Sequence, residues 1–168
     1  ATMTIGALAW TAGNLQWLRP RTGVRLVQLL DGAGLSPAGK AQPARRWQPT
    51  GACTQFAATA PPDDFSKPES FAFIATYADA VGPWKRHLLG SRATRGDDTT
   101  ETSRRLVEPS RFVTLAHAAG LAVHPWTFRN EPMHLAADYG GDPVAAYLQF
   151  FRLGVDGVFS DFPDTAVE

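Results

Sequence analysis

The chain has 168 residues, of which 44% are hydrophobic, and its 16 basic side chains balance its 16 acidic ones. This balance excludes a net field that would attract nucleic acid or an anionic membrane surface. Cys53 is the single cysteine, so an internal disulfide and a cysteine-based zinc cluster are excluded. The sequence has no stretch near the roughly 18 apolar residues of a membrane span, and its length is that of one ordinary domain.

The first part of the chain predicts two strands and a helix, followed by a long insertion. The strands are expected at residues 5–10 and 24–30, and a short helix at residues 14–19. Residues 31–66 then contain five prolines and several glycines with little periodicity. Such a composition predicts a loop, and a loop this long inside a compact domain is usually functional.

The middle of the chain predicts a helix and a short strand. Ser66 and Glu69 have the spacing of a capping box, which predicts a helix from Ser66 through Ala78. Residues 81–83 are expected to form a short strand, and residues 91–103 a polar loop. The expected inner face of the helix comprises Phe71, Ile74, Tyr77 and Ala78.

A clearer helix-then-strand unit follows. Pro109 suits the first turn of a helix and Gly120 suits the position after its last turn. A strand is expected at residues 121–128, either ended or bulged by Pro125. The apolar stripe of the helix consists of Phe112, Leu115, Ala116 and Ala119.

The last part of the chain repeats this plan. Asp142 is the expected N-cap of a helix that begins at Pro143 and ends at Gly154, before a strand at residues 158–159. Two consecutive units of this kind predict an α/β fold with a parallel sheet. Four or five strands in all indicate an open sheet or part of an eight-stranded barrel. The expected inner stripe of the last helix is Val144, Tyr147, Leu148 and Phe151.

Four segments carry a resemblance to a known family. Residues 115–131 (LAHAAGLAVHPWTFRNE) and 154–164 (GVDGVFSDFPD) resemble the C-terminal part of glycerophosphodiester phosphodiesterases, in their periplasmic-type branch. Residues 77–84 (YADAVGPW) are similar to the segment that precedes them in that branch. Residues 14–30 are similar to the fifth βα unit and the following strand.

The resemblance implies a (β/α)8 TIM barrel of the phospholipase C-like phosphodiesterase type, of which residues 1–168 form the C-terminal half as a single partial domain. Such enzymes hydrolyse glycerophosphodiesters to glycerol 3-phosphate and an alcohol, with a divalent metal (Ca2+ or Mg2+) and two histidines. The branch implies a periplasmic or secreted location, although no signal peptide is recognisable in this segment.

The family's catalytic motifs are not found in this sequence. They are His-Arg-Gly, Pro-Glu-Asn/His-Thr, Glu-x-Asp, His-Asp and Glu-x-Lys, and the family carries them in its N-terminal half. We therefore expect no catalytic residue and no metal ligand here, and we expect the isolated segment to be inactive.

The resemblance implies a pocket wall instead. In the family the aromatic residue of the seventh strand faces the pocket, which places Trp126 there, with Phe162 on the next strand. Trp10 takes the place of a family phenylalanine, where Leu8-Ala9-Trp10-Thr11 replaces the usual Gln-Ser-Phe-Asp. Core packing is the alternative role for all three aromatic residues.

Each of the other candidate polar residues has a functional and a structural interpretation. His124 and Asp161 lie at the carboxyl ends of consecutive strands, where they are either a general base with its orienting acid or, as we favour, a backbone-bonded histidine and a turn cap. Lys85, Arg86 and Arg129 suit contacts with a phosphate, although solvated surface charges are the simpler reading.

Three hypotheses for function remain at this point. In the first, the chain is the C-terminal half of a phosphodiesterase and works with the missing N-terminal half of the barrel on a small glycerophosphodiester. In the second, it is a non-catalytic half-barrel whose open sheet edges bind a partner or a second copy. In the third, it is an unrelated α/β binding domain with a similar C-terminal motif.

Overall fold

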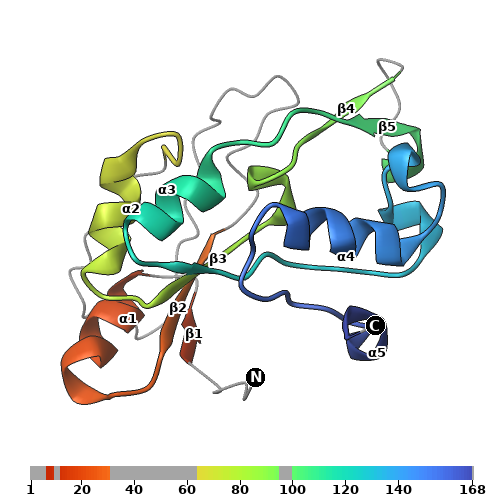
Figure 1. The fold of residues 1–168 in the computed structure, drawn as a ribbon. Coiled ribbons are helices and arrows are strands. Elements are labelled where there is room, and N and C mark those ends of the chain that lie inside the picture. The colour runs from red at the N-terminus through yellow and green to blue at the C-terminus, as the bar shows by residue number, and fades with distance from the viewer. Residues whose placement is uncertain (1–6, 10–11, 31–63, 95–99, 168) are drawn as a thin grey trace, which may run out of the picture.

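The computed structural model describes residues 7–9, 12–30, 64–94 and 100–167, and it confirms the predicted α/β fold with a parallel sheet. The main sheet has four strands, β1 (Ala7–Ala9), β2 (Leu26–Leu30), β3 (Ala80–Pro83) and β6 (Ala122–Val123), in that spatial order. Three helices gather on one side of it (Figure 1), namely α1 (Ala12–Leu18), α2 (Pro68–Ala75) and α3 (Phe112–Ala118).

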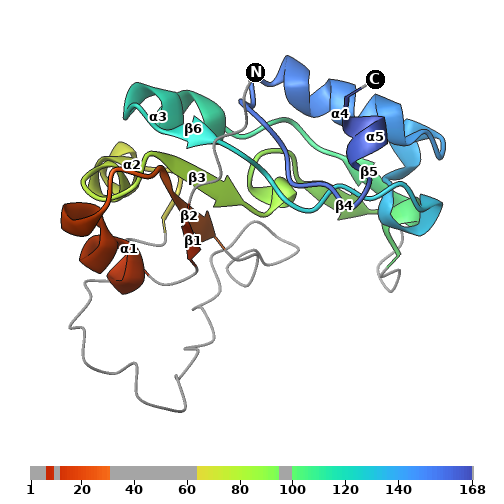
Figure 2. The same cartoon turned by 90° about the horizontal axis from the view of Figure 1, so that it is seen from below.

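The remaining elements lie beyond the carboxyl edge of this sheet or connect its strands. They include α4 (Pro143–Arg152), α5 (Pro163–Ala166) and a hairpin of β4 (Ser91–Ala93) with β5 (Arg104–Leu106), seen from below in Figure 2. Short 3-10 helices are η1 (Arg19–Arg21), η3 (Lys85–His87), η4 (Glu101–Ser103), η5 (Pro132–His134) and η6 (Ala137–Tyr139). No helix in the described ranges has the length and apolar character needed to cross a membrane.

Two predicted loops have different outcomes. The prediction of a loop at residues 91–103 is wrong for its first three residues, because β4 pairs with β5 in antiparallel register and Arg104 donates two hydrogen bonds to Ser91. Residues 95–99 of the predicted loop lie outside the described residues. This hairpin lacks the alternation of apolar and polar residues that marks a half-buried strand, so periodicity did not reveal it. The predicted insertion at residues 31–66 lies largely outside the described residues, which resume at Asp64.

The first strands and helix form close to where they were predicted. Strand β2 buries Leu26 and Leu30 against the helices, with exposed fractions of 0% and 5%. The side chain of Gln28 is also buried, and it donates to the Leu29 carbonyl (2.9 Å) and accepts from the Tyr77 hydroxyl (3.1 Å). These bonds satisfy a buried amide that would otherwise destabilise the strand.

Helix α2 has the predicted inner face but not the predicted cap. Its four expected inner residues, Phe71, Ile74, Tyr77 and Ala78, are all buried, the last two just after the helix ends. The capping box is wrong, because the N-cap is Lys67 and has no side-chain cap bond. The Ser66 hydroxyl instead donates to the Asp64 carboxylate (2.5 Å), which holds the turn before the helix.

The strand after α3 is shorter than predicted. Regular pairing with β3 stops at Val123, although the N–H groups of His124 and Trp126 still donate to the Val81 and Pro83 carbonyls (2.9 and 3.0 Å). The chain nevertheless continues in parallel contact, through isolated bridges between Trp84 and Trp126 and between Phe128 and Ser160. The predicted strand at residues 158–159 is therefore wrong, because neither residue belongs to a strand and the single bridge lies one position later, at Ser160.

Helix α4 begins as predicted but presents a different face. The Asp142 carboxylate accepts a hydrogen bond from the Val144 N–H (2.9 Å), which confirms the N-cap. Of the predicted stripe, Tyr147 is buried and Val144 half-buried, whereas Leu148 and Phe151 are 47% and 42% exposed. The buried residues of this helix are Ala146, Tyr147 and Phe150.

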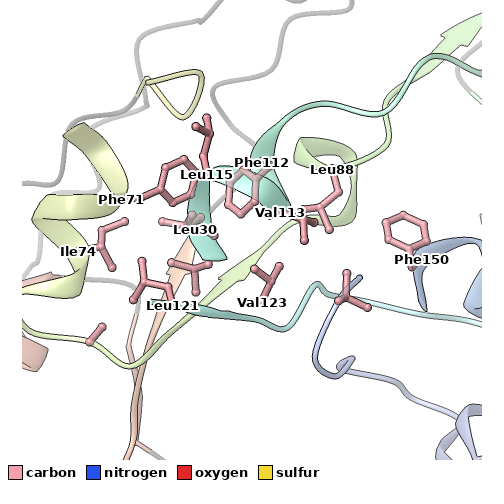
Figure 3. Packing of buried hydrophobic residues seen from close by; sticks show 14 of the residues in the cluster. Leu30, Phe71, Ile74, Leu88, Phe112, Val113, Leu115, Leu121, Val123 and Phe150 are labelled. Atoms are coloured by element: carbon pink, nitrogen blue, oxygen red, sulfur yellow. The ribbon is translucent and has the colours of Figure 1, made fainter. Parts of the chain in front are cut away.

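The hydrophobic core lies between the sheet and its helices (Figure 3). The rings of Phe71 and Phe112 meet edge to face at 4.9 Å and join α2 to α3. Further along, Phe128 stacks on Tyr147 (4.9 Å) and meets Phe150 edge to face (5.0 Å). These aromatic contacts attach α4 to the chain that continues β6, so the core runs on beyond the regular sheet.

The opposite face of the sheet is closely packed around a glycine. Successive strand residues alternate between faces, so Gly82 lies opposite the core residue Val81. A Cβ atom on Gly82 would lie 2.6 Å from Leu29 Cδ2 and 3.3 Å from the Phe159 ring. The absence of a side chain here allows Leu29 and Phe159 to cover the strand.

Candidate functional site

Three segments bring their carboxyl ends to one edge of the structure. Trp84 follows β3, Trp126 follows β6, and Ser160 lies on the segment after α4, and parallel bridges align these ends. Parallel strands place all of their carboxyl ends on the same side, which is where βα folds build their active sites. The predicted site residues Trp126, Asp161 and Phe162 are therefore placed at a suitable edge.

Trp126 is half-buried and firmly oriented. Its indole Nε1 donates to the Gly82 carbonyl (2.8 Å), and its own backbone carbonyl accepts from the Lys85 N–H (2.9 Å). These bonds fix the ring against the end of β3. An indole whose polar edge is satisfied in this way leaves its apolar face for packing or for a ligand.

Phe162 and Asp161 lie in the turn before α5. The Ser160 hydroxyl accepts from the Phe162 N–H (2.8 Å) and shares a hydrogen bond with the Tyr147 hydroxyl (2.5 Å). The Asp161 carboxylate is exposed and lies 3.5 Å from Arg129 Nε. Phe162 is half-buried, and Asp161 also donates its N–H to the Phe128 carbonyl (3.2 Å), as expected for a turn residue.

His124 is not joined to Asp161 by any hydrogen bond or ion pair in the part of the chain that the structure describes. It packs edge to face on Phe159 (6.3 Å) and against Gly157. Burial lowers the pKa of His124, Asp156 opposes this shift and Arg25 adds to it. The shift favours the neutral ring, but no contact in the structure supports an acid–base pair with Asp161.

Trp10, the third predicted pocket residue, lies outside the described residues. Strand β1 ends just before it at Ala9, and α1 begins just after it at Ala12. Its place in a pocket stays a prediction.

Two of the three cations proposed for phosphate contact have carboxylate partners. Arg129 pairs with Glu131 (2.6 Å) and Asp161 (3.5 Å). Arg86 forms an ion pair with Glu101 and also lies over the Trp84 ring (4.7 Å). These pairs leave little of either guanidinium for a phosphate.

Lys85 is different, and it lines a recess that sequence reasoning missed. The Lys85 recess, as we call it, is half-open and has room for about one or two water molecules. Its walls come from segments far apart in the sequence, and none of the predicted pocket residues lines it. The residues that do line the Lys85 recess include Lys85, Leu89, Phe128, Ala136, Tyr139 and Phe150.

The hairpin and the loop after β6 are tied together around this recess. The Asp138 carboxylate accepts from the Leu106 N–H (2.9 Å) and lies 3.5 Å from an Arg105 nitrogen. Leu106 and Arg105 belong to β5 and Asp138 belongs to η6, so this carboxylate connects the hairpin to η6. No single sequence motif indicates this contact, since its partners are separated by more than 30 residues.

A divalent cation does not fit the residues that the structure describes. Among them, no group of three or more His, Cys, Asp or Glu side chains converges in a way that suits a metal ion. We therefore derive no step through a cation from this part of the protein.

A family model and several known proteins match this chain over more than half of its length. The model of the glycerophosphoryl diester phosphodiesterase family matches residues 63–165, which is more than half of the chain. A glycerophosphodiester phosphodiesterase of Arabidopsis thaliana, GDPD6, is 34% identical over 91 residues, which cover 54% of this chain and 22% of that protein. GDPDL1 from the same plant is 35% identical over 100 residues, covering 58% and 12%.

A bacterial relative also matches the chain over only part of its own length. The glycerophosphodiester phosphodiesterase of Haemophilus influenzae is 30% identical over 103 residues, which cover 61% of this chain and 25% of that protein. The chain thus spans a quarter or less of the length of these relatives. The hypothesis of an unrelated α/β domain is wrong, because the family match includes both helix-then-strand units and the edge formed by Trp84, Trp126 and Ser160. The chain belongs to the glycerophosphoryl diester phosphodiesterase family.

Proposed function

We propose that this chain forms part of a (β/α)8 barrel that hydrolyses glycerophosphodiesters to glycerol 3-phosphate and an alcohol, and that it supplies one wall of the substrate pocket. The observation that carries the proposal is the alignment of Trp84, Trp126 and Ser160 at one carboxyl edge, in a chain that belongs to this family. The relatives' names describe such phosphodiesterases.

The wall would act by binding and by excluding water. The Trp126 ring, held by its bond to the Gly82 carbonyl, offers an apolar surface for the carbon atoms of a glycerol or alcohol group. We assign the same role to Phe162, which follows Ser160 on the next segment, and to Trp10. A rigid aromatic wall holds a flexible diester in a reactive position at a low entropic cost.

The reacting groups are assigned to the rest of the barrel. A bound Ca2+ or Mg2+ would polarise the phosphoryl group there. The described residues supply no ligand set for it, so its ligands and the acid–base histidines are proposed to lie outside this segment. We accordingly expect residues 1–168 alone to hydrolyse nothing.

Steady-state hydrolysis of glycerophosphocholine tests the wall. In the protein with whatever flanking sequence its gene encodes, we expect Trp126→Ala to raise KM about tenfold with a smaller change in kcat. Trp17→Ala is a matched control, because Trp17 is 42% exposed on α1, away from the carboxyl edge. Unchanged KM in Trp126→Ala, with full activity of the parent, would remove the proposed role.

A second candidate function rests on the open sheet. In the described residues, β1 pairs with β2 on one side alone, and Leu8 in this strand is 49% exposed. Such an edge favours pairing with another chain, so a non-catalytic half-barrel that self-associates remains a proposal. Sedimentation equilibrium of residues 1–168 distinguishes the two, because a monomer at high concentration contradicts self-association.

The location is a further proposal from the same family branch. We expect the protein in the periplasm or secreted. Fractionation of the source cells, with antibody detection of the protein, would place it, and recovery in the cytoplasmic fraction would contradict the proposal.

A further inference from the structure

The Lys85 recess contains polar groups that the protein leaves incompletely bonded. Lys85 is half-buried, and the one hydrogen bond of its ammonium is a long one to the His134 carbonyl (3.4 Å). Its nitrogen also lies 5.8 Å from the centre of the Phe128 ring. An ammonium has three N–H donors, so at least one of them has no acceptor within the described part of the chain.

A second unsatisfied group belongs to a residue that lines the same recess. The Tyr139 hydroxyl is buried and has no hydrogen-bond partner among the residues that the structure describes. A buried hydroxyl without a partner destabilises the native state, because it has lost its hydrogen bonds to water without replacing them. Both residues line one half-open recess, so the recess suits an acceptor from outside the protein, either water or an anion.

The charges nearby favour an anion over a neutral acceptor. Arg86 is neutralised by Glu101. Arg104 is bonded to the neutral Ser91 and lies close enough to Arg86 to lower the pKa of that guanidinium, after the larger effect of burial. Glu101 lines the recess together with Arg86, and Asp138 lies close enough to Tyr139 to raise its pKa, after the larger effect of burial, but Asp138 itself lies 3.5 Å from Arg105. Lys85 and Arg104 have no carboxylate partner among the described residues, so positive charges outnumber negative ones around the recess.

We propose that the Lys85 recess binds one small oxyanion of the phosphate class, with Lys85 Nζ and the Tyr139 hydroxyl donating to its oxygens. The space inside accommodates oxygen atoms, and the open side accommodates the rest of the anion. A charged oxygen acceptor satisfies both donors at once with short, charge-assisted hydrogen bonds. The recess is lined by none of the residues of the proposed substrate wall, so this site does not depend on the proposed hydrolysis.

Calorimetric titration with inorganic phosphate tests the site. The titration is run with a chelator at pH 7, so that phosphate held by a metal does not contribute. We expect saturable binding at one site, at least tenfold weaker in Lys85→Met and about three- to tenfold weaker in Tyr139→Phe. Lys67→Met is the matched control, because the Lys67 side chain is 65% exposed and should leave binding unchanged.

A second titration, with glycerol 3-phosphate, distinguishes a site for a phosphate monoester from a site for free phosphate. Tighter binding of glycerol 3-phosphate than of inorganic phosphate would assign the site to a phosphate monoester, and the reverse order would assign it to the free ion. No saturable binding, or equal binding by the parent and Lys85→Met, would overturn the proposal. If Lys85→Met fails to fold, the 13C-methylated lysine signals of the parent decide, since phosphate must shift the Lys85 signal and not that of Lys67.

Discussion

The His117 ring and the Asp156 carboxylate lie 2.9 Å apart and join α3 to the segment after α4. The same carboxylate oxygen accepts from the Val123 N–H (2.8 Å) at the end of β6. One side chain therefore connects a helix, a strand and the following connection. Burial raises the pKa of Asp156, but the hydrogen bonds from Val123 and His117 outweigh burial, so its pKa lies below the ordinary value.

A first prediction concerns stability in acid. Because the native pKa of Asp156 is depressed, its contribution to stability is fully present above its unfolded pKa of about 4 and is lost as the pH falls through the native value. Urea unfolding should show Asp156→Asn to be less stable by about 1–2 kcal/mol at pH 7. The difference should shrink below pH 4, and a constant difference across pH would contradict the assignment.

A second prediction concerns alkaline pH. Burial, with the charge of Arg86, lowers the pKa of Lys85 from 10.5 to about 8. Between these values the unfolded chain binds more protons at this site than the native chain, so the free energy of unfolding should rise from pH 8 toward pH 10. Lys85→Met should be more stable than the parent at pH 7, by about 1–3 kcal/mol.

The measurement is the difference in the free energy of unfolding between the parent and Lys85→Met across pH 7 to 10. It should narrow as the pH rises, since deprotonation removes the cost of the buried charge in the parent. Titration of Tyr77 and Tyr139 does not affect this difference, because burial raises the pKa of each to about 12 in both proteins. A parallel pair of curves would show that the Lys85 pKa is not lowered.

A third prediction concerns the close approach at Gly82. We expect Gly82→Ala to lower the free energy of unfolding by about 1–3 kcal/mol, because its Cβ would meet Leu29 at 2.6 Å. Gly23→Ala is the control, since a Cβ there has no atom within 4 Å. In a Leu29→Ala background the cost of Gly82→Ala should largely disappear, and full additivity in this double-mutant cycle would contradict the contact.

A fourth prediction concerns the cap of α4. Asp142→Ala should reduce stability by about 1 kcal/mol, because the Val144 N–H loses its acceptor. Asp142→Asn keeps an acceptor oxygen and should cost only a few tenths of a kcal/mol. Thermal unfolding of the two variants compares them directly, and equal losses would mean that the charge of Asp142, and not its hydrogen bond, stabilises the helix.

Local signals in the sequence predicted much of the fold. Asp142 followed by Pro143 marked the start of α4, and the spacing of Phe71 and Ile74 identified the face of α2 that packs on the sheet. Both depend on neighbours within one or two turns of a helix. Such interactions are encoded over a few residues and can be recognised without knowing the rest of the structure.

The orientation of α4 depends on contacts that are distant in sequence. Phe150 and Phe151 are adjacent, so the helix carries two overlapping apolar stripes and periodicity alone does not choose between them. Stacking of Phe128 on Tyr147, with Phe150 at its edge, selects the stripe that is buried. The Lys85 recess was missed for the same reason, because Tyr139 and Phe128 reach Lys85 only through tertiary packing.

The link through Asp138 has a consequence for exchanging parts of this protein with its relatives. The β4–β5 hairpin and the loop that contains η6 share one carboxylate, bonded to Leu106 and close to Arg105. A chimera that receives a foreign hairpin but keeps the native loop leaves Asp138 without its backbone donor at an interface built for it. The two segments should therefore be transplanted as a single unit.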